Sequence, residues 1–85
     1  MADTQTRVSV TSAAWVSITS GPVAVGTISP ETQDVRVAIS TTGAPADLTQ
    51  GHLLHSNGGW GFVLDTGETL WAIATRQNTS VIATY

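Results

Sequence analysis

The sequence predicts an all-β fold, a small antiparallel β-sandwich or β-barrel of seven to eight short strands. Short runs rich in Val, Ile and Thr recur along the whole chain, and turn-forming Gly, Pro, Asn and Asp separate them at close spacing. Within several runs apolar and polar residues alternate, which is the period of a strand with one buried face. The only pattern that favours a helix is one turn near Thr11–Trp15.

The first half of the chain predicts four strands, at residues 6–11, 14–19, 23–28 and 34–40. Gly and Pro residues end the second and third of them, and neither residue type continues a paired strand well. The fourth strand has the strictest alternation, because Val35, Val37 and Ile39 are each followed by a polar or small residue. We therefore expect these three side chains to lie in the core.

A loop opens the second half. Residues 41–51 form the longest polar stretch and contain Gly43 and Pro45, which favour a loop over a strand. Four further strands are predicted after it, at residues 52–55, 60–64, 69–75 and 80–85.

Turn residues separate these later strands. Ser56-Asn57-Gly58-Gly59 is a strong turn signal, because Asn-Gly readily adopts positive φ. A second tight turn at 65–68 predicts that strands 60–64 and 69–75 pair as a hairpin. Phe62 and Leu64 share one face of their strand with Trp60, and we expect Phe62 and Leu64 to complete the core.

Composition excludes several functional classes. The 85 residues include three Arg and no Lys, and the net charge is −3, so no basic face can neutralise a run of phosphates. The absence of Cys excludes disulfides, cysteine-ligated zinc and a cysteine nucleophile. No apolar run approaches the ~20 residues of a membrane-spanning helix. The polar start around Asp3 and Arg7 does not resemble a signal peptide. We expect a protein that binds neither nucleic acid nor membrane.

The residues do not suggest catalysis, a cofactor or a metal site. His52 and His55 are the only histidines, and at a spacing of three along a strand their side chains point to opposite faces. They would not converge on one ion with Asp47 or Asp65. No nucleophile elbow or phosphate-binding glycine motif is present. Asp65 and Glu68 flank one turn, which is typical of turn chemistry and solubility rather than of a general acid. We therefore expect no enzyme.

Three Trp residues are many for a chain of this length. Trp60 lies between Gly59 and Gly61, which leave its ring uncovered by neighbouring side chains. Such a ring could stack on a sugar, belong to the core or lie in a subunit interface. Trp15 and Trp71, placed within strands, favour core or interface positions.

The order of several segments resembles that of small β-rich virion proteins of tailed bacteriophages, of the capsid decoration (cement) or minor tail type. The resemblance covers nearly the full chain. Its most specific segment is Gly67-Glu68-Thr69-Leu70-Trp71-Ala72. The other segments are Ala13-Ala14-Trp15-Val16, Asp34-Val35-Arg36-Val37-Ala38-Ile39, Ala44-Pro45-Ala46-Asp47 and Gly51-His52-Leu53-Leu54. The resemblance implies a β-sandwich or small barrel assembled symmetrically on a capsid or tail, without catalytic residues.

These observations lead us to expect a decoration protein on the virion capsid surface that binds and stabilises the major-capsid lattice. A tail or fibre component and a carbohydrate-binding module that uses Trp60 remain as alternatives. A small core without disulfides favours a homo-oligomer, and a trimer would match the three-fold positions of an icosahedral shell. We expect residues 1–5 to form a flexible N-terminal arm and 6–85 a single β domain. The interface candidates are Ala2, Asp3, Thr4, Gln5, Thr42, Pro45, Asp47 and Trp60.

Overall fold

The computed structural model describes residues 5–45, 51–56 and 58–85, and within these ranges the chain forms strands and turns without a helix. The predicted all-β fold is confirmed, and each predicted strand has a counterpart. The eight strands are β1 (Gln5–Val10), β2 (Val16–Ser20), β3 (Val23–Pro30), β4 (Val35–Ser40), β5 (His52–Leu54), β6 (Trp60–Leu64), β7 (Thr69–Ala74) and β8 (Thr79–Thr84).

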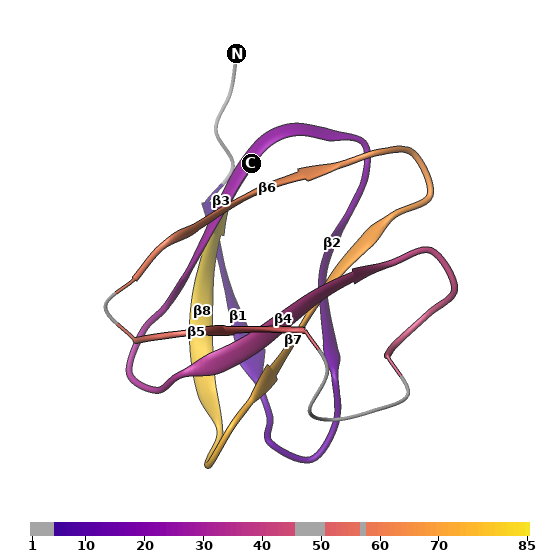
Figure 1. Cartoon of the computed structure of the whole chain (residues 1–85). Helices are drawn as coiled ribbons and strands as arrows, with labels where there is room; N and C mark the ends of the chain where they lie inside the picture. Colours follow the sequence, from indigo (N-terminus) through magenta and orange to yellow (C-terminus); the bar gives the residue numbers. More distant parts are fainter. Residues whose placement is uncertain (1–4, 46–50, 57) are drawn as a thin grey trace.

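The strands form two four-stranded antiparallel sheets that make the two layers of a sandwich (Figure 1). The order is β1-β8-β3-β6 in one sheet, here called sheet A, and β2-β7-β4-β5 in the other, sheet B. The pairs β1–β8, β2–β7, β3–β6 and β4–β5 are nested, as if one long hairpin had been rolled up. This nesting defines the eight-stranded jelly roll.

The core lies between the two sheets and is built from alternate residues of each strand. Val35 and Val37 have no exposed surface, while Phe62 and Leu64 are 5% and 2% exposed, so these four predicted core positions are confirmed. Ile39 was predicted to be buried with them, and this prediction is wrong because its side chain is 37% exposed. The described pairing of β4 with β5 ends at Val37 and His52, so Ile39 lies beyond the last paired position on that side.

The predicted turn at Asp65–Glu68 is present. Glu68 N donates to the Asp65 carbonyl at 3.0 Å, and Gly67 has φ +91°, the conformation that a type II turn requires at its third residue. The hairpin predicted around it is wrong. β6 pairs with β3 in sheet A, whereas β7 pairs with β2 and β4 in sheet B, so the turn carries the chain from one sheet to the other. β6 and β7 each bury an apolar face. Because the two strands lie in facing sheets, both apolar faces point into the core between the sheets.

The boundary of the expected N-terminal arm also needs correction. Gln5 begins β1 and pairs with Thr84 of β8, because the sheet ladder continues to this residue. Residues 1–4 lie outside the described residues. Among the described ranges, no helix is long and apolar enough to cross a membrane.

Candidate binding surface

Reactive sites are usually built from charged side chains that lie close together. In the described part of the chain, no three His, Asp or Glu side chains gather closely enough to hold a metal ion. His52 and His55 have different neighbours. His52 lies against the ring of Trp60, with 5.8 Å between the ring centroids, whereas His55 Nδ1 lies 3.5 Å from a carboxylate oxygen of Asp34.

Asp34 ties three connecting segments together. Its Oδ1 accepts a hydrogen bond from the backbone N–H of Ser56 at 2.9 Å, and its carbonyl accepts one from the Thr75 hydroxyl at 3.0 Å. A polar hollow of about 200 Å³ lies beside these groups and includes Arg76 in its wall. Because the carboxylate already binds a backbone N–H, its role here is to hold the ends of β4, β5 and β7 in place.

Glu31 ties two strands to the connection after β3. The guanidinium of Arg7 donates to both of its carboxylate oxygens, at 2.8 Å from Nε and 3.2 Å from Nη2, and the Ser80 hydroxyl donates to the same carboxylate. The hydrogen bonds from Ser80 and then from Arg7 favour the charged form, and they lower the pKa of Glu31 below its ordinary value. An acid held ionised in this way stabilises the fold and is a poor proton donor near neutral pH.

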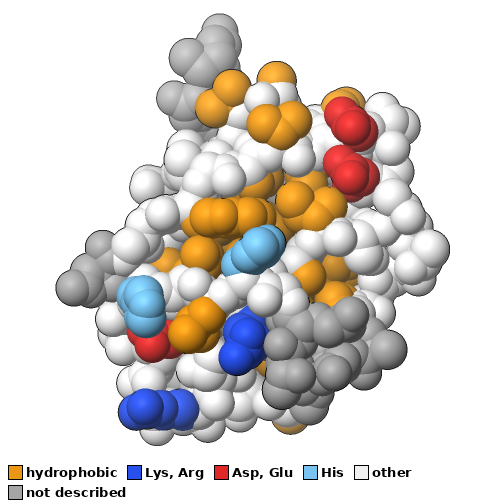
Figure 2. All heavy atoms as spheres, in the orientation of Figure 1, with side chains coloured by type: hydrophobic (Ala, Val, Ile, Leu, Met, Phe, Trp, Pro, Cys, Tyr) orange, Lys and Arg blue, Asp and Glu red, His pale blue; other side chains and the backbone are white. Residues whose placement is uncertain are grey.

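An apolar slot opens between the edge strands of the two sheets. It is a hollow of about 310 Å³ lined by Ala38, Ile39, Gly51, His52 and Trp60. Trp60 belongs to β6 of sheet A, and His52 to β5 of sheet B, so the slot is the open side of the sandwich. In Figure 2, hydrophobic side chains gather at the centre of this face, with one histidine beside them.

Phe62 supports the ring of Trp60 from within the sandwich. The two ring centroids are 6.5 Å apart, with an interplanar angle of 26°. Trp60 is half-buried, which leaves part of its ring available to a partner. Trp60 thus packs against the core cluster and keeps part of its ring exposed, so the core, interface and sugar-stacking alternatives for this residue are not decided by its position. The residues that surround it come from strands distant in the sequence.

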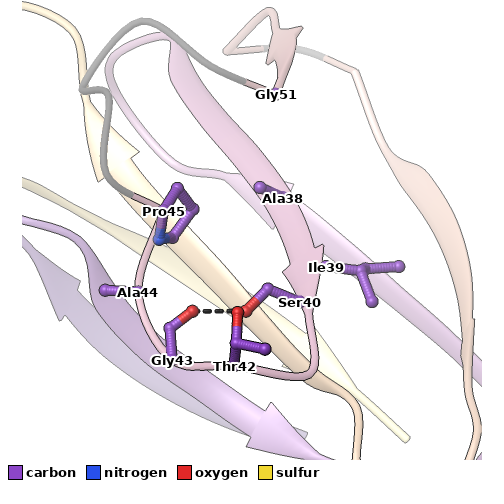
Figure 3. Close-up of a pocket in the computed structure, with 8 residues that line it drawn as sticks. All are labelled: Ala38, Ile39, Ser40, Thr42, Gly43, Ala44, Pro45 and Gly51. Carbon is purple, nitrogen blue, oxygen red and sulfur yellow. Dashed lines mark hydrogen bonds between the residues drawn. The ribbon is translucent and has the colours of Figure 1, made fainter.

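A second hollow, of about 410 Å³, lies at the end of β4, where Figure 3 shows its eight lining residues. Thr42 and Pro45, two predicted interface residues, belong to it. The Ser40 hydroxyl donates to the Gly43 carbonyl, so one of the two lining hydroxyl groups is already used. Ile39 extends away from Pro45, on the other side of β4 (Figure 3). The described lining carries no charged side chain, so this hollow offers little chemistry.

Two exposed valines extend the apolar surface onto the outer face of sheet A. Val25 is 78% exposed and Val63 is 60% exposed. They lie on the paired strands β3 and β6, in the stretch between the partners Val23–Leu64 and Gly26–Phe62. β6 thus presents apolar side chains toward both faces of its sheet.

The remaining predicted positions are scattered. Ala2, Asp3, Thr4 and Asp47 lie outside the described residues, as does Asn57 of the predicted turn. Trp15 is 8% exposed and directly precedes β2 rather than lying within it. Trp71 is half-buried in β7, and its Nε1 has no hydrogen bond in the described structure. Of the predicted interface set, Thr42 and Pro45 line one hollow and Trp60 lines the slot, and the two hollows share Ala38, Ile39 and Gly51.

Comparison of the chain with protein-family models, curated proteins and solved structures gave no significant match. The fold and its surface define a class on their own, a small jelly-roll domain with an apolar open side. Asp34 and Glu31 could have been noticed in the sequence as acids flanking strand ends. No local signal marks the slot, because sheet stacking alone brings His52 and Trp60 together.

Proposed function

We propose that this protein is a non-enzymatic structural component of a phage virion, of the capsid decoration type, that binds and stabilises the major-capsid lattice. The observation that carries the proposal is the apolar open side of the sandwich, where Trp60, Ile39 and His52 line a slot beside an uncharged edge strand. Such a surface suits adhesion to another protein surface, because interface cores are depleted in charge and enriched in aromatic residues.

Three further observations support this proposal. The best connected carboxylates, Asp34 and Glu31, hold loops and strands together instead of facing a cleft with a free nucleophile. Eight-stranded jelly rolls occur in viral capsid and lectin domains, which is support by fold analogy alone. The order of sequence segments also resembles that of small virion proteins.

Co-sedimentation with undecorated capsids tests the proposal. We expect the intact chain to pellet with the particles and a Trp60→Ala variant to remain largely in the supernatant. Leu53→Ala is a matched control, since Leu53 is 44% exposed on the neighbouring strand β5 but does not line the slot. A variant that lacks residues 1–4 tests the expected arm and should bind more weakly. If the intact chain stays in solution, the capsid proposal is wrong and the tail or fibre alternative is favoured.

A carbohydrate-binding module is the second candidate, and the partly exposed ring of Trp60 with His52 beside it favours it. Sugars also need several hydrogen-bonding groups around the stacking ring, and His52 is the only polar side chain besides Trp60 in the described lining. Asp65, the acidic residue closest to Trp60 in the sequence, follows the opposite end of β6. A change in tryptophan fluorescence on titration with oligosaccharides, absent in Trp60→Ala, would support this candidate over the first.

The sequence also predicts that copies of this chain associate with one another, which is a separate question from capsid binding. The sequence-based trimer depends on the three-fold positions of a capsid shell rather than on particular residues. Among the described strands, the free edge of β6 offers a specific contact through which copies could associate.

A further inference from the structure

We propose that β6 pairs with β6 of a second copy of this chain, in antiparallel orientation about a two-fold axis at Phe62. The pairing would join two A sheets into one continuous sheet of eight strands. This inference concerns only the contact between copies, and it stands or falls separately from capsid binding.

The edge strands of the two sheets differ in how well they are protected against pairing with another chain. β6 is an edge strand of sheet A and consists of Trp60-Gly61-Phe62-Val63-Leu64, without a charged residue or proline. Natural edge strands usually carry such residues, or bulges, or are very short, because a bare edge pairs with other chains. The other described edges follow this rule, since β1 contains Arg7, β2 carries an extra residue between Ser17 and Thr19, and β5 has three residues. The ladder between β3 and β6 is also irregular, but its extra residue lies on β3, between Val23 and Gly26, so β6 itself is unbulged.

Apolar side chains along the β6 edge are exposed to solvent. Val63 and its neighbour on β3, Val25, are 60% and 78% exposed, and the ring of Trp60 is only half-buried. A monomer leaves these groups in water. A strand added at the β6 edge would cover Val63 on one face of the sheet and part of the Trp60 ring on the other, while Ile39 and His52 of the slot belong to sheet B and lie outside the pairing.

The sequence of β6 is complementary to that of a second, antiparallel copy of β6. With Phe62 on the axis, residue 61 of each copy lies opposite residue 63 of the other, and residue 60 lies opposite residue 64. Each Val63 then has Gly61 of the second copy across from it, where the absence of a side chain leaves room for the isopropyl group. Trp60 lies across from Leu64, an aromatic–aliphatic pair of the kind that stabilises sheets. A two-fold contact of this type uses the same patch on both copies.

Charge does not oppose a second copy as the occupant. The nearest charged residue along the chain is Asp65, directly after β6. In the proposed register Asp65 lies opposite Gly59 of the other copy, and the two Asp65 residues are separated by about six residues along the ribbon, or roughly 20 Å. That distance exceeds the ~8 Å screening length at physiological salt, so the net charge of −3 does not oppose this contact strongly.

The contact is small, because one five-residue strand forms its centre. Stable interfaces bury about 1,200–2,000 Å², and smaller ones are weak or transient. We therefore expect a dimer that dissociates on dilution. Sedimentation velocity across roughly a hundredfold concentration range, from low micromolar upward, should show the mass rising from one chain toward two.

Cysteine trapping tests the register, and the absence of natural Cys removes any background. Gly61→Cys and Val63→Cys are made separately and mixed. Residues directly opposite in an antiparallel pair have Cα atoms about 4.5–5.5 Å apart, within reach of a disulfide, whereas the diagonal pairs 61–61 and 63–63 are about 7–8 Å apart. We expect the mixture to form a disulfide-linked dimer in high yield and each variant alone to form little.

Both substitutions are compatible with the fold. A Cβ on Gly61 would lie 3.8 Å from the Gly26 carbonyl oxygen, an ordinary contact, and Val63 is already exposed. Circular dichroism of each variant verifies this. Ser9→Cys on the opposite edge, β1, is the control for random collision.

A cysteine-free variant gives an independent result. Val63→Lys adds a charge to the edge without removing core volume, and we expect it to remain monomeric at concentrations where the native chain is dimeric. Three results would overturn the proposal: a constant monomer mass, a trimer mass unaffected by Val63→Lys, or cross-linking of the mixture no greater than that of Ser9→Cys.

Discussion

Replacing Gly26 by alanine tests how sheet A is packed. Gly26 pairs with Phe62 across β3 and β6, and the phenyl ring lies over the glycine. An alanine Cβ would be 2.5 Å from Phe62 Cζ and 2.6 Å from Cε2, whereas carbon atoms in contact prefer about 3.5–4.0 Å. The ring would have to move by about 1 Å, although Phe62 is only 5% exposed and packed on all sides.

The expected cost follows from two opposing effects. Overpacking a well-filled core costs about 1–3 kcal/mol, whereas alanine restricts the unfolded chain more than glycine and returns about 0.4–1 kcal/mol. We therefore expect Gly26→Ala to lower the free energy of unfolding by about 1–2 kcal/mol. For a domain of this size that corresponds to a Tm lower by roughly 5–15 °C. Urea denaturation at a fixed protein concentration measures the difference.

Gly61→Ala is the matched control, because Gly61 lies on the same strand pair and its added Cβ would make an ordinary contact. At low micromolar concentration, where the proposed contact between β6 strands is dissociated, it should be neutral or slightly stabilising. In a Phe62→Leu background the ring is absent, so Gly26→Ala should lose most of its cost and the double-mutant cycle should show a coupling of about 0.5–3 kcal/mol. If Gly26→Ala were no more costly than Gly61→Ala, or showed no coupling to Phe62, the ring would not constrain this position.

Three other substitutions test the core and the two carboxylate ties. Val37→Asp places an unpaired carboxylate in the core and should prevent cooperative folding, whereas Leu53→Asp, on the exposed side of β5, should remain folded by circular dichroism. The pKa of Glu31 is lowered in the folded state, so its stabilising effect is complete above the ordinary value of 4.5 and is lost as pH falls through the lower folded pKa. Glu31→Gln should therefore reduce the fall in Tm as the pH is lowered below 4.5, and an unchanged pH profile would contradict this. Asp34→Ala leaves a backbone N–H without its acceptor and should cost about 1 kcal/mol in urea denaturation, more than His55→Ala, which removes only an exposed side chain 3.5 Å from the Asp34 carboxylate.

The strands were predictable because their signal is local. The alternation around Val35 and Val37 is visible in adjacent residues, and it led to the observed β4 and its buried face. Ile39 follows the same alternation but is exposed, because burial also depends on where the neighbouring strand ends. The point at which β5 ends depends on the residues of β5 and cannot be read from those of β4.

Partner strands were not predictable in the same way. The turn signal at 65–68 is real, yet a tight turn can join strands in one sheet or carry the chain between two sheets. The choice here depends on the nested pairing of all eight strands. For the same reason the sequence singled out Trp60 but could not supply its neighbours His52 and Ile39, which the stacking of the two sheets brings to the slot.

The nested strand order determines when the domain can fold during its synthesis on the ribosome. β1 pairs only with β8, and β2 pairs only with β7, so the first strands to be synthesised have no sheet partner until the last two emerge. β7 and β8 are also inner strands of their sheets. Contacts between the two ends of a chain carry a high loop-closure entropy, and proteins dominated by them fold in milliseconds to seconds. This domain should therefore fold only once β7 and β8 have been synthesised, in one cooperative step, and nascent chains that stop before residue 69 should bind chaperones instead of folding.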